Sequence, residues 1–423
     1  MGKRENIHFY SGQSTHCIAC GKCCGWWPIP VTHAEVKRVS ALDFSGWKYQ
    51  QKSYFKLTWK GWYLRKRDGH CVFQDDDGLC IVHKRYGFDI KPLACRLYPL
   101  DVYKWDDGSV SAALRYDCPA VAQIVKEKPS ESFYSSINSF SSEVFTYRGK
   151  LAKASYSPRL SPGTARLREI ASAYERILLS DPKNPEVCFY AAGCLLKHHQ
   201  DRKNSEDITD AEEFGPDSFS FFMRSKKYLS EVIRDADPMR PDILMRFRYL
   251  VWCFLRDDAQ SSLINHFPMA MEAVRFLFGK GTLARTVLRL PARSSSLFYA
   301  MEHCSAAPDA MNLYYRFLRG RLQSMHFCGN PALGLTFEEG MSFLILSFPV
   351  TMAVAGILAL AQKRTVIETR DVCMTLRLID HAFLRSRLYA RRSTRKCAVK
   401  VALSDDYAYL MQLLRKENSQ PRS

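Results

Sequence analysis

Eight of the fifteen cysteines lie within the first 118 residues, and four of these form the run Cys17-Ile-Ala-Cys20-Gly-Lys-Cys23-Cys24. The other four follow singly, at Cys71, Cys80, Cys95 and Cys118. Paired thiols at C-x2-C spacing can hold a soft or borderline metal with little loop-closure cost. All eight cysteines are therefore predicted ligands of zinc or of the iron in an iron–sulfur cluster.

The N-terminal residues Met-Gly-Lys-Arg-Glu-Asn are charged and show no apolar segment of a signal peptide. We therefore expect a cytoplasmic location, where thiols stay reduced. In such a compartment, closely spaced cysteines are more often metal ligands than disulfides.

The number and type of metal sites stay open from the spacing. Cys17, Cys20 and Cys23 have the first spacing of bacterial ferredoxin clusters, and Pro119 follows Cys118. Cys24 departs from that pattern, and we expect its side chain to diverge from that of Cys23. A histidine can replace a thiol in either kind of site, and the candidates are His16, His33, His70 and His83. The later cysteines are predicted core residues: Cys188, Cys194, Cys253, Cys304, Cys328, Cys373 and Cys397.

Four segments in order resemble a known family. They are Cys17-x2-Cys20-x2-Cys23-Cys24-Gly25-Trp26, Gly69-x-Cys71-x-Phe73, Gly78-x-Cys80 with Arg85-Tyr86-Gly87, and Lys91-Pro92-x2-Cys95-Arg96-x-Tyr98-Pro99. Together they resemble the YkgJ-type cysteine-cluster family, which is described as zinc- or iron-chelating and includes flagellin lysine-N-methylase. The resemblance implies a metal-binding domain over roughly residues 15–120. It also implies a protein-lysine N-methyltransferase that uses S-adenosylmethionine and acts on a protein substrate.

The composition along the chain predicts an α+β protein with two domains. We expect a cysteine-cluster domain of short elements over residues 1–125, a Ser- and Pro-rich connector over 126–162, and an α-helical domain over 163–423. Asp106-Asp107-Gly108-Ser109 predicts a hairpin turn between 103–105 and 110–112.

Apolar residues recur at helical spacing from Thr164 onward, and Thr336 with Glu339 forms a capping-box pattern. The polar stretch Lys197–Gly215 is predicted to be a loop. Met341–Ala361 contains 21 uncharged residues, which is long enough to span a bilayer. Because Pro349 interrupts the segment, we expect two buried helices and no membrane span.

The formal net charge of +18 favours acidic partners. The run Arg385, Arg387, Arg391, Arg392, Arg395 and Lys396 could form an anion-binding surface or one solvated helix face. No sequence motif of an RNA- or DNA-binding fold supports nucleic acid as a partner. No glycine-rich dinucleotide or nucleotide motif occurs either, so the catalytic and S-adenosylmethionine-binding residues stay unassigned. The alternative to an enzyme is a metal-stabilised module that binds protein or nucleic acid.

Overall fold

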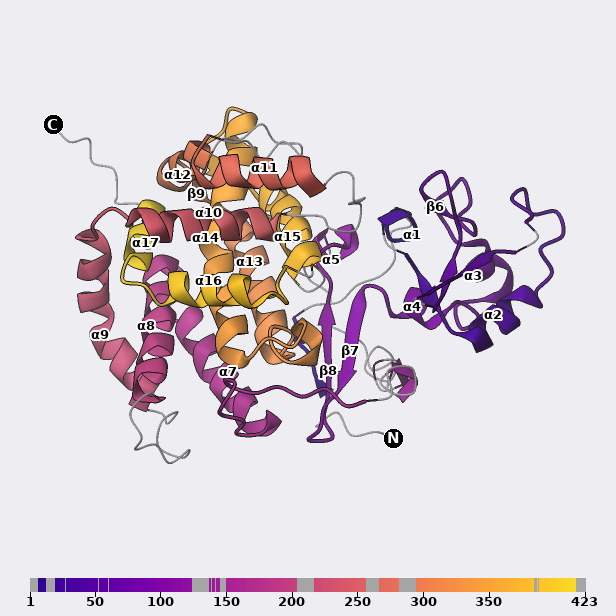
Figure 1. Ribbon diagram of the computed structural model, residues 1–423, viewed down its shortest axis with the longest axis horizontal. Coiled ribbons are helices and arrows are strands. Elements are labelled where there is room, and N and C mark those ends of the chain that lie inside the picture. The colour runs from indigo at the N-terminus through magenta and orange to yellow at the C-terminus, as the bar shows by residue number, and fades with distance from the viewer. Residues whose placement is uncertain are drawn as a thin grey trace. The chain divides into compact units, whose positions relative to one another are not determined.

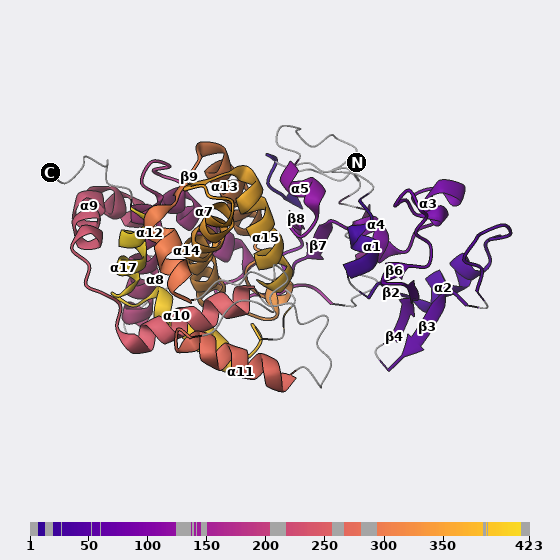
Figure 2. The same ribbon diagram turned by 90° about the horizontal axis from the view of Figure 1, so that it is seen from above.

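The structure is a computed structural model, and its chain divides into two compact units. It describes residues 7–12, 20–26, 28–51, 53–59, 61–123, 137, 139–140, 142–144, 150–203, 217–255, 266–280, 294–383, 386 and 388–415. We name residues 1–104 with 109–151 the cysteine unit, and residues 105–108 with 152–423 the helical unit. Strands and helices both occur (Figures 1 and 2), so the protein contains the elements of an α+β fold. Of the expected connector, residues 126–162, the positions 126–136, 138, 141 and 145–149 lie outside the described residues.

Short strands of the cysteine unit form three small sheets. The first has the order β2 (Pro30–Val31), β4 (Gly61–Leu64), β3 (Phe55–Thr58), and both of its pairings are antiparallel. The second pairs β5 (Lys66–Arg67) with β6 (His70–Cys71). The third has the order β1 (Ile7–His8), β8 (Val110–Leu114), β7 (Leu100–Lys104). Its β7–β8 pair is antiparallel with Lys104 opposite Val110, which confirms the predicted hairpin.

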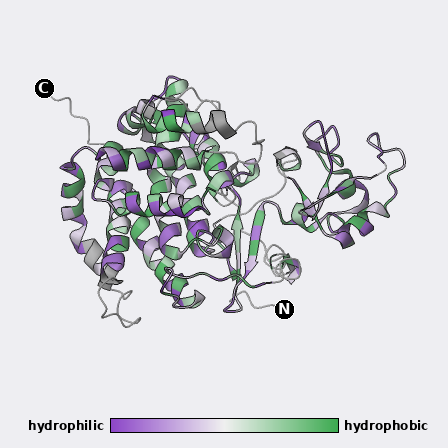
Figure 3. Cartoon of the chain, in the orientation of Figure 1, coloured by the Kyte–Doolittle hydropathy of each residue, from purple (hydrophilic) through white to green (hydrophobic). Residues whose placement is uncertain are grey.

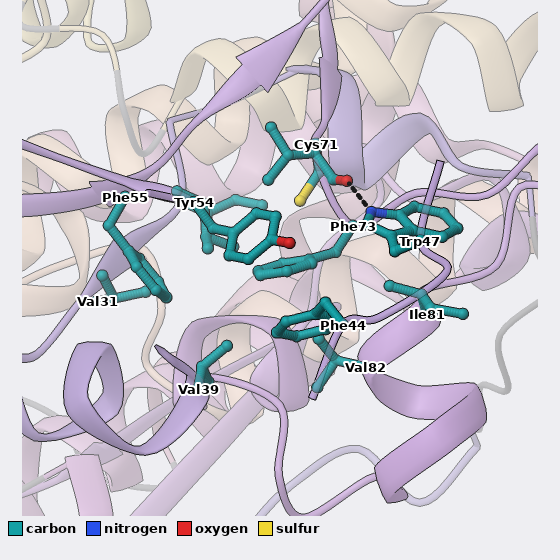
Figure 4. Close-up of a cluster of buried hydrophobic side chains, with 13 residues drawn as sticks. Val31, Val39, Phe44, Trp47, Tyr54, Phe55, Cys71, Phe73, Ile81 and Val82 are labelled. Carbon is teal, nitrogen blue, oxygen red and sulfur yellow. Dashed lines mark hydrogen bonds between the residues drawn. The ribbon is translucent and has the colours of Figure 1, made fainter. Parts of the chain in front are cut away.

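Five short helices lie among the described residues of the cysteine unit and connect these strands. They are α1 (Lys22–Trp26), α2 (His33–Ser40), α3 (Ile81–Tyr86), α4 (Leu93–Leu97) and α5 (Pro119–Gln123). Aromatic rings fill the space between them: Phe44 lies 4.8 Å from Tyr54 and 5.1 Å from Phe73, measured between ring centroids. The Trp47 indole donates a hydrogen bond of 3.2 Å to the carbonyl of Val72 (Figure 4). Cys71 is buried in the same cluster, so one predicted metal ligand is anchored in the core.

The helical unit contains eleven described helices and a two-stranded parallel pairing of β9 (Ser305–Ala306) with β10 (Val366–Ile367). The helices are α7 (Thr164–Leu178), α8 (Pro185–Lys203), α9 (Asp217–Arg234), α10 (Pro241–Phe254), α11 (His266–Leu277), α12 (Ser294–His303), α13 (Pro308–Gln323), α14 (Phe337–Ala361), α15 (Thr369–Phe383), α16 (Arg392–Ala402) and α17 (Tyr407–Leu414). Most of them carry both hydrophobic and hydrophilic residues (Figure 3), as expected of helices with one buried face. The predicted loop from Lys197 is wrong for its first residues, because α8 continues to Lys203.

The central helix of this unit is α14, which packs against α8, α12, α15, α16 and α17. Thr336 and Glu339 form the predicted capping box at its start. Among the described residues it is the one helix long and apolar enough to cross a membrane, but 89% of its most apolar window is buried inside the structure. The predicted burial is thus confirmed.

The predicted division of this segment into two helices is wrong, because α14 continues through Pro349. Proline has no amide hydrogen, so the carbonyl four residues earlier loses its helical donor. That carbonyl belongs to Ile345, and it accepts a buried hydrogen bond of 3.1 Å from the Tyr407 hydroxyl on α17. A side chain from another helix therefore satisfies the group that proline leaves unpaired.

Candidate metal centre

The described part of the first cysteine cluster is a tight turn that leads into α1. Gly21 has φ +65°, and the amide of Cys24 donates to its carbonyl at 3.0 Å. A Cβ atom at Gly21 would lie 1.8 Å from Nε2 of Gln74. Glycine is thus required here both by its backbone conformation and by the close approach of Gln74. Cys17 lies outside the described residues.

Cys23 and Cys24 place their sulfur atoms 3.9 Å apart. Two thiolates bound at about 2.3 Å to one tetrahedral ion would lie about 3.8 Å apart. The expected divergence of these adjacent side chains is therefore wrong. Successive side chains on a helix are separated by about 100° rather than by the opposite directions of a strand, so short α1 allows the two sulfurs to approach.

Cys23 favours the neutral thiol when no cation is near. The pKa of Cys23 is raised above its ordinary range by the hydrogen bond with Cys24, by burial and by charge repulsion from Cys24. A bound metal ion reverses this preference, because its positive charge favours the thiolate. The pair is suited to a cation and poorly suited to free thiolates.

Three further cysteines come from separate elements around the same core. Cys71 ends β6, Cys80 is the N-cap residue of α3, and Cys95 lies on α4. Burial, with smaller contributions from charge on Cys80 and Cys23, raises the pKa of Cys71 to about 12, although a hydrogen bond from the amide of Phe73 lowers it. Burial also raises the pKa of Cys95 strongly, with added repulsion from Cys71, Cys80 and Cys23. These thiols therefore lie close enough to affect one another's charge.

Glu35 fixes the position of the helix that carries Cys95. Its Oε1 accepts a buried hydrogen bond of 2.6 Å from the amide of Leu93, the first residue of α4. Its Oε2 accepts from the amide of Thr32 at 2.7 Å and completes the capping box of α2. One buried carboxylate thus ties the starts of two helices together. The spacing Thr32-x-x-Glu35 signals the capping box in the sequence, but nothing local signals the bond to Leu93.

Gln74 lies between the turn at Gly21 and the segment that carries His70 and Cys80. Its Oε1 lies 3.0 Å from Nδ1 of His70, and its Nε2 is the group that Gly21 accommodates. The backbone of Gln74 forms an isolated antiparallel β-bridge with the backbone of Cys80. Sequence reasoning missed this residue, because no motif marks a glutamine that packs against a glycine 53 residues earlier.

Cys118 lies at the start of α5 and is 8% exposed. Burial raises its pKa to about 11, while the amides of Ala120 and Val121 lower it and the charges of Asp117 and Cys20 raise it. Charge on Cys118 and on Cys23 also raises the pKa of the Tyr98 hydroxyl, after the larger effect of burial. The hydroxyl of Tyr98 itself donates a hydrogen bond of 3.4 Å to Asp117, the residue before Cys118.

The candidate histidines make other contacts. His70 binds Gln74, His33 packs near Trp62 with ring centroids 6.3 Å apart, and His83 packs against Phe88 at 5.8 Å. His16 lies outside the described residues. Among the residues that the structure describes, no three His, Cys, Asp or Glu side chains lie together in metal-holding geometry. The structure thus places Cys71 in one hydrophobic core with Cys24, Cys80 and Cys95 packed against it, and it does not define which thiols share a metal.

Two charged groups near the cysteines have structural partners. The guanidinium of Arg96 forms a two-pronged ion pair with Glu143, with Nη1 donating to Oε1 at 3.0 Å. The acidic turn Asp75–Asp77 is held by two lysines, with Asp75 lying 3.1 Å from Lys48 and 2.8 Å from Lys84. This arrangement identifies the turn as an ion-paired surface turn rather than a calcium site.

The cysteine spacing and the arrangement of the cysteines agree with a family comparison. Residues 16–118 match the CxxCxxCC family. Its description is "Putative zinc- or iron-chelating domain". The matched residues include all eight predicted ligands, from Cys17 to Cys118. The match supports membership of this part of the chain in the cysteine-cluster family. No curated protein and no solved structure matches the chain.

Proposed function

We propose that the CxxCxxCC region binds zinc or iron through its cysteine thiolates. The observation that carries this proposal is the 3.9 Å distance between the sulfurs of Cys23 and Cys24, which suits two donors of one tetrahedral ion. The family description supports the same metals. Buried thiols with raised pKa values supply the soft donors that these metals prefer.

In this proposal, Cys23 and Cys24 supply two thiolates from α1, and further donors come from Cys71, Cys80 and Cys95 on three other elements. Cys17, Cys20 and Cys118 are the remaining candidates. Gly21 permits the turn, Gln74 holds His70, and Glu35 orients the helix of Cys95. A bound metal would cross-link these elements and, as an iron–sulfur cluster, would also supply one-electron chemistry.

The test is metal analysis of the protein purified without oxygen. Zinc or iron in stoichiometric amount is the expected result, and the visible spectrum separates the two metals because an iron–sulfur cluster is coloured and zinc–thiolate is not. Cys23→Ser should lower the metal content, whereas Cys397→Ser should not. Cys397 is a matched control because it lies in the helical unit, where its thiol donates to the carbonyl of Arg246 at 3.6 Å. Unchanged metal in Cys23→Ser would contradict the proposal.

We further propose that the protein is a cytoplasmic enzyme that methylates lysine in another protein, with S-adenosylmethionine as the donor. The ordered four-segment resemblance to the cysteine-cluster family supports this proposal. A cavity of about 160 Å³ in the cysteine unit suits a single side chain, and its lining includes Leu97, Tyr98, Asp101 and Arg115. The Asp101 carboxylate would attract a lysine ammonium, and the partly apolar wall and the positive charge of Arg115 would lower the pKa of that lysine toward the neutral amine that attacks.

This second proposal is tested with metal-replete protein, S-adenosylmethionine and candidate substrate proteins. Mass spectrometry should detect increments of one methyl group on lysine. Asp101→Asn should lower the rate while the metal content stays normal, and Asp309→Asn on α13 is a control far from the cavity in sequence. If calorimetry detects no binding of S-adenosylmethionine and no lysine is modified, the protein is better explained as a metal-stabilised binding module.

A further inference from the structure

The basic residues near the C-terminus differ in what they contact. Arg395 is used inside the fold: it donates to the carbonyls of Leu333 at 2.9 Å and Gly334 at 3.1 Å, and it pairs with Glu339 at 3.3 Å. Arg392 and Lys396 instead line a cavity of about 680 Å³. Arg385 and Arg387 lie outside the described residues.

This cavity collects positive charge from three elements of the helical unit. Arg392, Lys396 and Lys400 follow one another at intervals of four on α16, so they lie along one helix face. Lys197 comes from α8, and Arg240 is the N-cap residue of α10. The lining holds five cationic and three acidic side chains, so its charge is positive overall.

The pairing of these charges shows which of them can take a ligand. Lys197 binds Asp405 at 2.7 Å, Arg240 binds Asp406 at 2.8 Å, and Lys400 binds Asp242 at 3.2 Å. For Arg392 and Lys396 no ion-pair partner occurs within the part of the chain that the structure describes. Both are exposed, and they are one turn apart. The positive end of the α16 dipole adds to their charge, since α16 begins at Arg392.

The wall beside these two cations is apolar. Val399 on α16 is half-buried, and the lining is completed by two buried residues, Leu403 directly after α16 and Ile243 on α10. A volume of about 680 Å³ lies within the roughly 300–1,000 Å³ of small-molecule sites. The cavity therefore combines an unpaired positive pair with an apolar wall, which suits an anion that carries an apolar or aromatic part.

We propose that this cavity binds a phosphorylated small molecule of mononucleotide size. Arg392 and Lys396 contact the phosphate groups, with the guanidinium able to bind two phosphate oxygens at once. Val399 contacts the apolar part of the ligand. S-adenosylmethionine carries a sulfonium and an ammonium cation against one carboxylate, so the positive cavity disfavours it. This inference is independent of the metal centre and of the methylation proposal.

The test is calorimetry of the full-length protein at low salt with ATP and inorganic phosphate as separate probes. ATP should bind, and phosphate alone should bind more weakly because it lacks an apolar part. The double variant Arg392→Gln/Lys396→Gln should weaken ATP binding by at least about tenfold. The control Lys183→Gln/Lys227→Gln removes the same charge from exposed positions outside the cavity lining and should keep normal affinity.

Three results would overturn the inference. They are no ATP binding by the folded protein, equal weakening in both double variants, and tight binding of a single-stranded oligonucleotide that ATP does not displace. The last result would identify a nucleic-acid surface instead of a pocket. Circular dichroism of each variant, with helix content equal to that of the parent protein, excludes unfolding as the cause of a lost signal.

Discussion

The strands of the cysteine unit have two to five residues and its helices five to eight, whereas α14 of the helical unit alone has 25 residues. Long helices bury continuous apolar faces against one another. Short elements joined by turns bury less apolar surface for each residue that they order. The helical unit can thus be stabilised by packing alone. The cysteine unit has a smaller core, and we expect metal ligation by its thiols to supply the additional stability.

Buried polar groups show the same contrast. In the helical unit, Arg321 is paired with Asp380, and both are almost fully buried at 1% and 0% exposure. The cysteine unit has a similar buried pair, Arg115 with Asp117 at 8% and 3% exposure, but it also has thiols such as Cys71 whose pKa values are raised by burial, and a cation would stabilise their charged form. The comparison predicts that metal removal affects one unit and that loss of packing or pairing affects the other.

The largest expected effect is on the metal centre. Cys95→Ser should destabilise the cysteine unit by at least about 3 kcal/mol, a fraction of the roughly 10–16 kcal/mol that structural zinc contributes in small domains. Hydrogen exchange measured by mass spectrometry should show faster exchange in α4 and β6 but not in α14. A chelator should have the same effect on the parent protein. Equal protection of α4 with and without metal would show that packing alone maintains this unit.

The second effect concerns the ion pair between α13 and α15. Arg321→Leu should destabilise the helical unit by about 3–5 kcal/mol, because it leaves the Asp380 carboxylate buried without its cation. The double variant Arg321→Leu/Asp380→Leu should recover part of this loss. Denaturant unfolding followed by hydrogen exchange separates the two units, and metal content should not change. A loss below about 1 kcal/mol in the single variant would contradict the assigned role.

The third effect concerns the continuity of α14. Tyr407→Phe should cost about 1–3 kcal/mol, because it leaves the Ile345 carbonyl buried without a donor. In a Pro349→Ala background the cost should be smaller, since the amide of residue 349 can then donate to Ile345. The double-mutant cycle measures this coupling. Equal costs of Tyr407→Phe in both backgrounds would show that the hydroxyl does not compensate for the proline.

The features that the sequence predicted correctly depend on neighbouring residues. Thr336 and Glu339 are three residues apart, and the turn Asp106–Ser109 lies within its own hairpin, so local chemistry determines both. Late cysteines such as Cys253 and Cys304 are buried as expected. The spacing of the first cluster also pointed to the region that the family comparison identifies.

The features that the sequence missed depend on distant partners. Pro349 suggested a helix end because Tyr407, 58 residues later, cannot be recognised as a donor to Ile345. The bond from Leu93 to Glu35 spans 58 residues in the same way. The approach of Cys23 to Cys24 was missed for another reason, since it depends on their lying in a short helix. Lys197–Lys203 was missed because a helix with an exposed face tolerates polar residues.

The smallest effect concerns the acidic turn of the cysteine unit. Lys84, the amide of Asp76 and Lys48 hold the pKa of Asp75 below its ordinary range, in that order of importance. A lowered pKa means that this stabilisation is present above the ordinary carboxyl pKa of about 4 and is lost as the pH falls below it. Asp75→Asn should therefore destabilise the cysteine unit slightly at neutral pH.

Salt provides the control for this last prediction, because acid also protonates metal-binding thiolates. The loss in Asp75→Asn should shrink between about 0.05 and 0.5 M sodium chloride, since salt screens exposed ion pairs. Hydrogen exchange of α3, which carries Lys84, is the measurement, and α14 serves as the internal reference. If the loss is as large at high salt as at low salt, Asp75 acts through its backbone-facing hydrogen bond to Asp76 and not through the two lysines.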